Sequence, residues 1–233
     1  MPERCVAVVT ASTSGIGLGI AEALAAEGAD IVLNGYGDAS SIETLRRRLA
    51  EESGVRVTYS AADMSKAVEA RGLIERATHE LGRVDILVNN AAAQHIAWVQ
   101  EFPAEAWDSI LAMNLSAAFH ATAAVLPQML ERDWGRIVNV ACGHGSAAAL
   151  RQCAYVAAKD GVIGLTRVVA RETAASGVTC NAICPGWGPD AQPHGAREVA
   201  SVAQVGGLVA FLCSEDAAQI RGAAVPIDAW LAT

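Results

Sequence analysis

The sequence predicts an α/β protein with a doubly wound parallel sheet that carries helices on both faces. Short apolar stretches of strand character alternate with stretches of helical periodicity along the chain. Most of the apolar stretches show no alternation of apolar and polar residues, which is typical of parallel strands buried between two helix layers. At 233 residues the chain is long enough for one such domain, so we expect a single domain over residues 1–233.

The first strand, turn and helix are predicted within residues 5–28. An apolar run from Cys5 to Val9 ends at Thr10, passes through small residues and restarts at Gly15 with helical spacing. The glycines of this turn let backbone approach a ligand closely, and the helix N-terminus behind them offers N–H groups to a pyrophosphate. Such a turn also occurs where a helix only packs on a strand, so alone it leaves both interpretations open.

The remaining elements follow in alternation. Strands are expected at 30–33, 55–59, 84–88, 135–141, 178–183 and 223–227, and helices at 41–52, 65–81, about 104–131, about 153–174 and about 200–212. In an open sheet of this Rossmann type, ligands bind beyond the carboxyl ends of the strands. The residues just after each strand are therefore the candidates for a functional site.

One predicted helix has the length of a membrane span. Residues 109–130 contain no Asp, Glu, Lys or Arg. Because Asn114, His120, Pro127 and Gln128 lie within this stretch, we expect a buried or subunit-interface helix instead.

Composition limits the partners of this chain. Hydrophobic residues make up 52% of the sequence and charged ones 18%, so we expect further burial between subunits of a homo-oligomer, a dimer or tetramer. The net charge of −8 gives no excess of positive charge that would attract nucleic acid or an anionic membrane. The N-terminus lacks a signal-peptide pattern and the six cysteines show no Cys-x-x-Cys spacing, so we expect a cytoplasmic protein without a metal site.

The residues after the second and third strands indicate the type of dinucleotide. The segment 34–38 reads Asn-Gly-Tyr-Gly-Asp and contains no Lys or Arg that could pair with a 2′-phosphate, which favours NAD over NADP. After the third strand, Asp63 has two interpretations that the sequence leaves open. Its carboxylate holds the adenine, or it caps the helix that begins near Ser65.

A catalytic pair is predicted at the start of the helix after the fifth strand. Tyr155 and Lys159 are four residues apart and share one face of that helix. The Lys159 ammonium can favour the phenolate and bring the pKa of Tyr155 from near 10 toward neutrality. A tyrosine so tuned can exchange a proton with an alcohol oxygen while hydride moves at carbon.

Taken together, these motifs resemble the short-chain dehydrogenase/reductase family over nearly the whole chain. The ordered set is Thr10…Gly15-x-Gly17, Asn89-Asn90-Ala91, Asn114, Tyr155-x-x-x-Lys159 and Pro185-Gly186. The stretches S-T-S-G-I-G-L-G-I-A, V-D-I-L-V-N-N-A and N-A-I-C-P-G-W look like those of the bacterial D-3-hydroxybutyrate dehydrogenases. The resemblance implies an NAD-dependent oxidoreductase that interconverts a secondary alcohol or hydroxy acid and its ketone.

The resemblance also implies a role for each matching residue. Tyr155 would be the acid/base, Lys159 would bind the nicotinamide ribose, and Asn114 would hold a water in the proton relay. Cofactor contacts would come from Thr10, Ser12, Thr13, Gly15, Ile16, Gly17, Asp63, Asn90, Lys159, Pro185 and Gly186. The substrate would meet Gln94, His144, Gln152 and Trp187. Without the resemblance, Gln94, His144 and Trp187 would be interpreted as a capping amide, a loop histidine and a core tryptophan.

The sequence also departs from the family pattern. Cys142 replaces the catalytic serine and is a weaker hydrogen-bond donor, which lowers the rate about tenfold to a hundredfold. A nucleophilic Cys142 with His144 as base finds no other support in the sequence. Ala11 and Ala92 replace two glycines, and a left-handed backbone at either would cost about 1 to 2 kcal/mol.

Two further departures affect the substrate side. Gln152 occupies the position of a carboxylate-binding lysine and supplies no charge. The Pro- and Gly-rich stretch 188–197 predicts a shortened substrate loop and a wider mouth. A binding protein without turnover and a non-redox enzyme that eliminates or isomerises therefore remain alternatives to the dehydrogenase.

Overall fold

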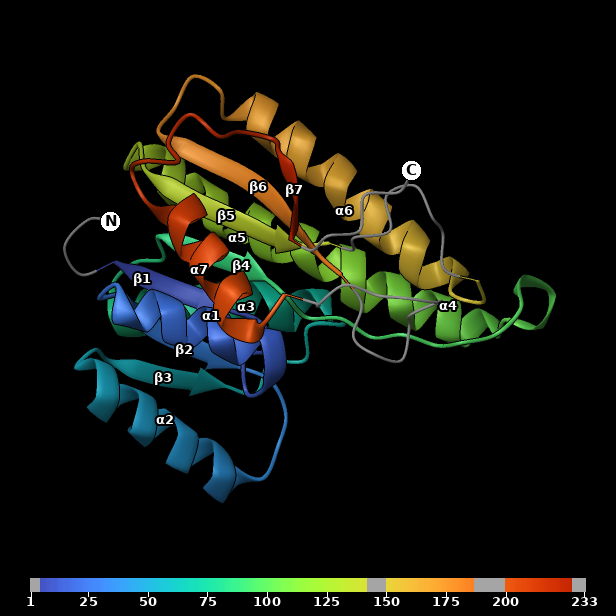
Figure 1. The fold of residues 1–233 in the computed structure, drawn as a ribbon, viewed down its shortest axis with the longest axis horizontal. Coiled ribbons are helices and arrows are strands. Elements are labelled where there is room, and N and C mark those ends of the chain that lie inside the picture. Colours follow the sequence, from blue (N-terminus) through green and yellow to red (C-terminus); the bar gives the residue numbers. More distant parts are fainter. Residues whose placement is uncertain (1–4, 142–149, 187–199, 228–233) are drawn as a thin grey trace.

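Seven parallel strands form one sheet in the computed structural model, which describes residues 5–141, 150–186 and 200–227. The order across the sheet is β3-β2-β1-β4-β5-β6-β7 (Figure 1). The strands are β1 Val6–Val9, β2 Asp30–Asn34, β3 Val57–Ser60, β4 Ile86–Asn89, β5 Gly135–Val140, β6 Val178–Pro185 and β7 Ala224–Ile227. The chain reverses its direction across the sheet between β1 and β4, where a doubly wound sheet binds its ligand.

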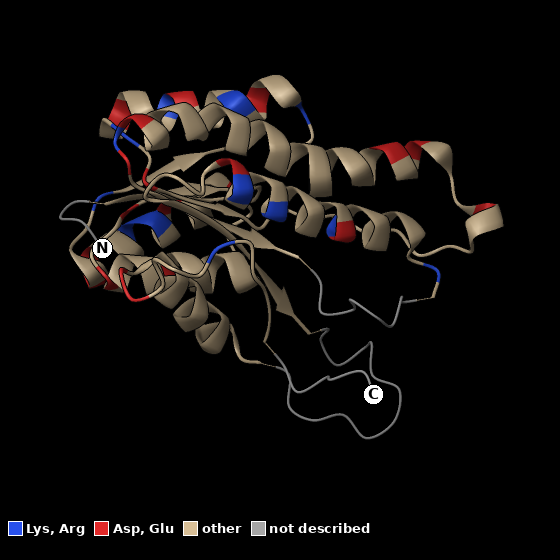
Figure 2. Ribbon diagram, turned by 90° about the horizontal axis from the view of Figure 1, so that it is seen from above, with Lys and Arg blue, Asp and Glu red and all other residues tan. Residues whose placement is uncertain are grey.

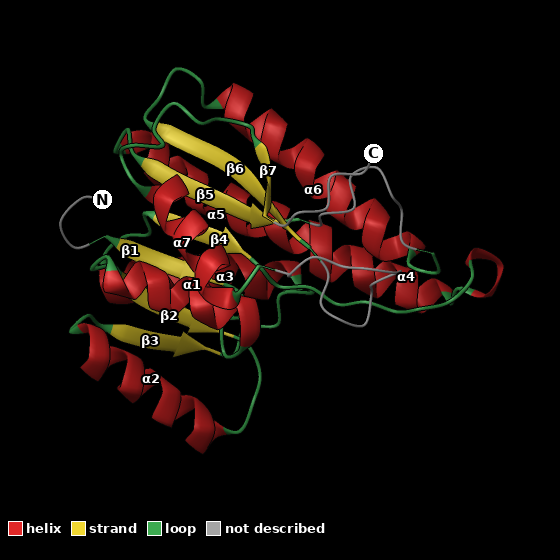
Figure 3. Cartoon of the chain, in the orientation of Figure 1, coloured by secondary structure: helices red, strands yellow, loops and turns green. Residues whose placement is uncertain are grey.

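Helices cover both faces of this sheet, as Figure 3 shows. The helices are α1 Gly15–Ala26, α2 Ala39–Ser53, α3 Ala67–Leu81, α4 Ala104–Leu111, α5 Ala117–Glu131, α6 Cys153–Glu172 and α7 Val202–Cys213. Side chains of α1, α2 and α7 share one buried apolar cluster with the sheet, and side chains of α3, α5 and α6 share the other. The doubly wound α/β architecture expected from the sequence is confirmed.

Strand β1 shows why the strands lack an alternating pattern. Ala7 and Val9 belong to the cluster under α1, whereas Val6 and Val8 belong to the cluster under α3, and all four side chains are buried. Because successive residues of a strand point to opposite faces, a strand covered on both sides must be apolar at every position. The element bounds expected from the sequence differ from the observed ones by only a few residues at most ends.

The single long helix expected at about 104–131 is not observed, because this stretch forms two α-helices. A π-helical turn, η2 Ala112–Ser116, separates α4 from α5. The side-chain amide of Asn114 in this turn accepts from the Ala93 N–H at 2.7 Å and donates to the Ala93 carbonyl at 2.9 Å. A π-turn inserted in an α-helix is often found at functional sites, and here it aims a buried amide at the segment after β4.

The same stretch passes the length and composition test for a membrane span, over Ala104–Glu131. Its residues Ala117, Ala121, Val125 and Met129 are buried and belong to the apolar cluster under α3. This is the packing of a core helix, in agreement with the expectation of a buried helix.

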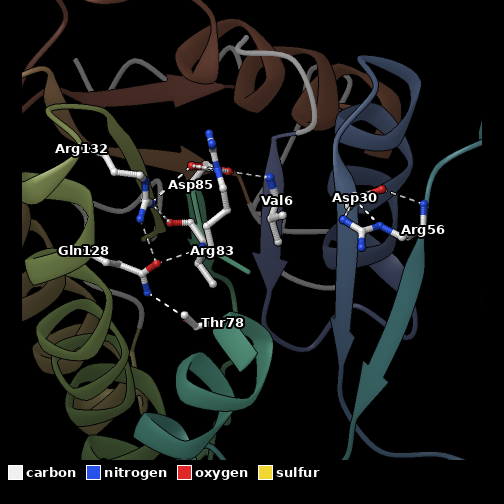
Figure 4. Close-up of polar contacts among 9 residues, drawn as sticks. Val6, Asp30, Arg56, Thr78, Arg83, Asp85, Gln128 and Arg132 are labelled. Atoms are coloured by element: carbon white, nitrogen blue, oxygen red, sulfur yellow. Dashed lines mark hydrogen bonds and ion pairs between the residues drawn. The ribbon is translucent and has the colours of Figure 1, made fainter. Parts of the chain in front are cut away.

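Charged side chains bind the strands together where the strands begin. Asp85, fully buried just before β4, accepts from the Val6 N–H at 2.9 Å, from Arg83 at 2.7 Å and from Arg132 at 3.3 Å. Arg56 donates to Asp30, the first residue of β2, at 2.8 Å. Figure 2 shows acidic and basic residues gathered around this end of the sheet, and Figure 4 shows the contacts.

Candidate active site

The turn between β1 and α1 is held by the neutral side chains of Ser12, within the turn, and of Asn90, just after β4. Ser12, fully buried, donates to the Val9 carbonyl at 2.7 Å and accepts from the Asn34 N–H at 3.1 Å. Asn90 donates its amide to the Thr10 and Ala11 carbonyls, both at 3.0 Å. Ser12 and Asn90 therefore stabilise the conformation of the turn. Their side chains would contact a cofactor only in addition to these structural hydrogen bonds.

Two glycines of this turn are required for different reasons. A Cβ on Gly17 would collide with the Ala11 carbonyl oxygen and would lie 2.5 Å from the Asn90 amide nitrogen, so Gly17 lets α1 approach the turn. Gly15 has a left-handed φ of +56°, and a Cβ there would have no heavy atom within 4 Å. Open space at the first residue of a helix is where an anionic group can reach the backbone.

The N-terminus of α1 keeps hydrogen-bonding capacity. The N-cap residue Ser14 makes no side-chain hydrogen bond to the helix, and the first turn contains no acidic residue. Helix N-terminal N–H groups without a cap, together with the positive end of the dipole, favour an anion. The expected pyrophosphate site is therefore supported by the geometry of α1.

Thr13 joins this turn to the end of β2, because its hydroxyl donates to the Tyr36 carbonyl at 3.1 Å. Ile16 is partly buried on α1.

The two alanines that replace family glycines behave differently. Ala11 has φ +49°, in the left-handed region where an alanine is strained, whereas Ala92 is not among the described non-glycine residues with positive φ. The strain expected at either position is therefore present at Ala11 alone of the two.

The ends of β2 and β3 carry carboxylates. Asp38 accepts from the Ser40 hydroxyl and the Ser41 N–H at the start of α2, and these hydrogen bonds hold its pKa below the usual range. Asp63 accepts from the Ser65 hydroxyl at 2.7 Å, and this hydrogen bond is the main reason why the pKa of Asp63 is lowered to about 2. Asp63 therefore caps the turn that leads into α3, and it is not the N-cap of that helix, which is Lys66.

Behind the site, neutral amides join β4, β5 and α6. Asn89 donates to the Asn139 side chain at 2.8 Å, and Asn139 donates to the Thr166 hydroxyl at 2.8 Å. Thr10 accepts from the N–H groups of Asn90 and Ala91, both at 2.9 Å, at the carboxyl end of β4. These bonds fix the strand ends that face the site without adding any charge.

The predicted catalytic pair lies at the carboxyl end of β5. The Lys159 side chain is only 3% exposed, and its ammonium donates to the Val140 carbonyl at 2.6 Å. The same ammonium lies 5.7 Å from the centre of the Tyr155 ring. A cavity of about 10 Å³ is lined by Thr10, Asn114 and Val140 among others, so residues from the ends of β1 and β5 and from the π-turn lie around one point.

The expected substrate residues divide into three groups. Gln94 is exposed in the segment after β4, next to the Ala93 that Asn114 holds. Gln152, the N-cap residue of α6, is buried, and its side-chain oxygen has no hydrogen-bond partner among the described residues. Cys142, His144, Trp187 and the stretch 188–197 lie outside the described residues, and Pro185 and Gly186 end β6 and follow it.

Thiol chemistry has little support in the described part of the chain. Burial raises the pKa of Cys180 and Cys213 to about 12, so both remain protonated thiols near neutral pH. Among the described residues, no group of three His, Cys, Asp or Glu could hold a metal ion.

Sequence reasoning missed one residue at this end of the sheet, Arg151. It precedes α6 with a left-handed φ of +66°, its carbonyl accepts from the Ala97 N–H at 2.9 Å, and its guanidinium lies 5.6 Å from the centre of the Trp98 ring. The sequence offers one feature that distinguishes Arg151: it is the only Lys or Arg between Arg136 and Lys159.

Comparisons with known proteins agree with this geometry. The family model described as short chain dehydrogenase matches residues 5–188. A D-beta-hydroxybutyrate dehydrogenase from Cupriavidus necator is 47% identical, with 97% of each chain covered. One from Rhizobium meliloti is 42% identical, with 95% of this chain and 96% of the relative covered.

A solved structure shows the same fold. The chain superposes on a crystal structure from Sinorhizobium meliloti 1021, assigned as a short-chain alcohol dehydrogenase, with a TM-score of 0.89 and 30% identity. The match covers 97% of this chain and 96% of that one.

Proposed function

We propose that this chain, which belongs to the short-chain dehydrogenase family, is an NAD(H)-dependent oxidoreductase that interconverts a hydroxy acid or other secondary alcohol and its ketone. Its relatives include two D-beta-hydroxybutyrate dehydrogenases, which supports a substrate similar to 3-hydroxybutyrate. The observation that carries the proposal is the buried Lys159 ammonium beside the ring of Tyr155.

A buried ammonium is a strong local source of positive potential. Taking an ammonium out of water is costly unless it is hydrogen-bonded, and the Val140 carbonyl at 2.6 Å satisfies one donor and fixes its position. A nearby positive charge favours the phenolate of Tyr155 over the phenol. We assign Tyr155 the role of the group that exchanges a proton with the substrate oxygen, and Lys159 the role of stabilising its anionic form.

The residues around the glycine turn fit a nicotinamide dinucleotide. Gly15 and the uncapped N-terminus of α1 would hold its pyrophosphate, and the turn is kept in shape by Ser12 and Asn90. When bound, the nicotinamide supplies or accepts the hydride. Asn114 holds the segment after β4 in position through both backbone groups of Ala93.

The charges near the adenosine end favour NAD over NADP. Asp38 and Asp63 are the first carboxylates after β2 and β3, and the segment 34–44 contains no Lys or Arg. A 2′-phosphate placed beside that segment would meet like charges without a guanidinium or ammonium from it to pair with. The 2′-hydroxyl of NAD carries no such penalty.

A homo-oligomer in the cytoplasm, acting on a small molecule, completes the proposal. Phe119 on α5 and Val168 on α6 are 48% and 53% exposed, which supports their burial against another subunit. Light scattering of the purified protein gives its mass in solution, and a monomer at micromolar concentration would contradict this part.

The activity is tested with a panel of hydroxy acids, ketones and secondary alcohols and with both forms of NAD. The parent should turn over at least one member, and Tyr155→Phe should lower kcat by a factor of about a hundred or more, because a positioned acid/base contributes that much. Ser53→Ala is the control, since it also removes a hydroxyl but at the C-terminal end of α2, where Ser53 donates to the Leu49 carbonyl. Absence of any Tyr155-dependent turnover would contradict the proposal.

Two further measurements separate the alternatives. Product that forms without added dinucleotide would indicate elimination or isomerisation. A Cys142→Ser variant should raise the rate about tenfold or more if a weakened hydrogen bond limits the dehydrogenase. No response to this substitution would favour the other two classes.

A further inference from the structure

A second cavity lies at the edge of the sheet, between β3 and α3. Its volume is about 370 Å³, which is within the usual size range of pockets that bind small organic molecules. Its lining includes Ser60, Ala61 and Ala62 at the end of β3, and Leu73 and Arg76 on α3. This cavity shares no lining residue with the one beside Asn114, so it is a separate feature of the molecule.

The cavity is open because β3 is an edge strand with small polar side chains on the side of α3. Val32 of β2 belongs to the apolar cluster under α3, and its register partner Thr58 on β3 faces the same side. Ser60, two residues further on, faces that side as well. The Thr58 hydroxyl oxygen is buried and has no hydrogen-bond partner among the described residues. This side of β3 therefore carries hydroxyl groups where a large apolar side chain would fill the space.

Arg76 brings a positive charge to the cavity. Its guanidinium donates to the Ser60 hydroxyl at 3.1 Å and forms no ion pair in the part of the chain that the structure describes. Gly72, one helical turn earlier, provides room for it, because a Cβ on Gly72 would lie 3.1 Å from the Arg76 Nη1. A glycine inside a helix weakens the helix, and here it lets the guanidinium lie against α3.

The other charges around the cavity favour a ligand with a single negative charge. Glu69 and Glu80 also line it. Glu69 accepts from the Asp63 N–H at 2.8 Å and pairs with Lys66 at 3.0 Å, so it is already bound. A carboxylate at Arg76 would gain a charge-assisted hydrogen bond, whereas a second negative charge on the same ligand would meet the two glutamates.

The rest of the lining suits a hydrocarbon group. Val32, Leu73 and Ala77 line the cavity and are at most 3% exposed, so they belong to its inner wall. Burial of a ligand's apolar part against these side chains is favourable.

We propose that this cavity is a second binding site, distinct from the active site, for a small organic monocarboxylate with a hydrocarbon body. The carboxylate binds Arg76, and the hydrocarbon body packs on Val32, Leu73 and Ala77.

Asn34 joins the wall of this cavity to the glycine turn. Its side chain donates to the carbonyls of Ser60 and Ala62, at 3.1 and 2.9 Å, and accepts from the Ala11 N–H at 3.2 Å. A ligand that orders the segment 60–62 therefore also orders the turn, so the monocarboxylate and the dinucleotide favour each other's binding. This coupling rests on the proposed function, because it takes the turn as the dinucleotide site.

Titration of the ¹⁵N-labelled protein with hexanoate, followed by NMR, tests the site. The amide signals of Ser60, Ala61 and Ala62 should shift and saturate with a Kd of about 1 mM, as expected for a small ligand with one charged contact. Hexanamide has the same body without the charge and should bind about tenfold more weakly. Sulfate that binds as tightly as hexanoate would overturn the ligand class.

Arg76→Gln should weaken hexanoate binding about tenfold or more and leave hexanamide binding unchanged. Arg71→Gln is the matched control, because Arg71 is exposed on the same helix and does not line the cavity. Urea unfolding checks that both variants are folded. Equal binding of hexanoate by the parent and Arg76→Gln, or shifts confined to residues around Tyr155, would overturn the inference.

The coupling is measured by titration of NADH with and without saturating hexanoate. Hexanoate should lower the Kd of NADH about two- to fivefold in the parent, NADH should lower the Kd of hexanoate by the same factor, and Arg76→Gln should show neither effect. Competition, no change, or an effect that survives in Arg76→Gln would overturn the coupling. A parent that binds hexanoate at Ser60–Ala62 but binds no dinucleotide would contradict the proposed function and leave the second site in place.

Discussion

The two ends of the sheet are held together by different chemistry. Where the strands begin, the links are buried and half-buried ions: Asp85 joins Val6, Arg83 and Arg132 (Figure 4). Where β1, β4 and β5 end, the corresponding links are neutral, as in the pairs Asn90 with Thr10 and Asn89 with Asn139.

This difference shows how neutral hydrogen bonds can hold the residues of a site in position without adding charged groups to it. Fixed ions at the ends of β1, β4 and β5 would interact with an anionic cofactor and with the Lys159 ammonium, because charges interact strongly at short range in a partly buried site. Amides and hydroxyls hold the turns by short-range hydrogen bonds instead. Lys159 is then the buried cation that lies beside the ring of Tyr155.

The strongest test of the charged end is Asp85→Ala. Removal of the carboxylate leaves Arg83 and Arg132 without their partner and the Val6 N–H without an acceptor, so we expect a loss of about 3 to 5 kcal/mol in the free energy of unfolding. Glu52→Ala, which breaks the exposed pair with Arg48, should cost no more than about 1 kcal/mol. Urea unfolding measures both, and equal effects would refute the structural role of Asp85.

The comparison is sharpest for two side-chain amides at opposite ends of the sheet, each of which accepts from a backbone N–H. Asn114 clamps both backbone groups of Ala93, and Gln128 accepts from the Val84 N–H at 3.0 Å while donating to Thr78 at 2.9 Å. We expect each alanine variant to lose about 2 kcal/mol of stability, as two hydrogen bonds do. Only Asn114→Ala should also lower kcat/KM per folded molecule, by about tenfold or more, because it frees the segment that carries Gln94.

If kinetics show the same change in kcat/KM for both variants, the assignment of the carboxyl end as the active site loses its support. Circular dichroism at the assay temperature confirms that both variants are folded during the assay.

Ala11→Gly tests the strain at the neutral end. Relief of the left-handed alanine gains about 1 to 2 kcal/mol, and the extra freedom of glycine in the unfolded chain offsets about 0.4 to 1 kcal/mol of this. We therefore expect a net gain of about 0.5 to 1 kcal/mol in urea unfolding. Ala92→Gly is the control and should destabilise or change nothing, since no relief of strain offsets its entropy. A gain at Ala92 in place of Ala11 would contradict the backbone assignment.

The smallest expected effect is the acid dependence contributed by Asp63. Its pKa is lowered from 3.8 to about 2, so its contribution to stability is present above about pH 4 and is lost as the pH falls toward 2. Asp63→Asn should therefore lower stability near neutral pH by less than about 1 kcal/mol, and this difference should shrink in acid. Denaturant titrations over a pH series measure it, and a difference that is constant with pH would argue against the hydrogen bond to Ser65.

The sheet could be predicted because its information is local. Runs such as Val6–Val9 and Ile86–Asn89 are apolar at nearly every position, and the glycines and small residues that bound them mark the turns. Tyr155 and Lys159 could also be found from sequence, since helical spacing alone puts them on one face.

The features that could not be predicted depend on contacts between distant segments. The π-turn at Asn114 is fixed by a bond to Ala93, 21 residues away, and nothing in the residues of the helix itself signals it. Ala11 and Ala92 look equivalent in sequence, because the φ of each is set by the strands around it. Arg151 was missed because exposed arginines are common, and only its contacts with Ala97 and Trp98 distinguish it.

The most direct test of the account is calorimetric titration of the purified protein with NADH and, separately, NADPH. The neutral turn at Gly15, with Asp38 and Asp63 nearby, predicts micromolar binding of NADH and binding of NADPH weaker by about tenfold or more. Binding of neither dinucleotide, or tighter binding of NADPH, would contradict it.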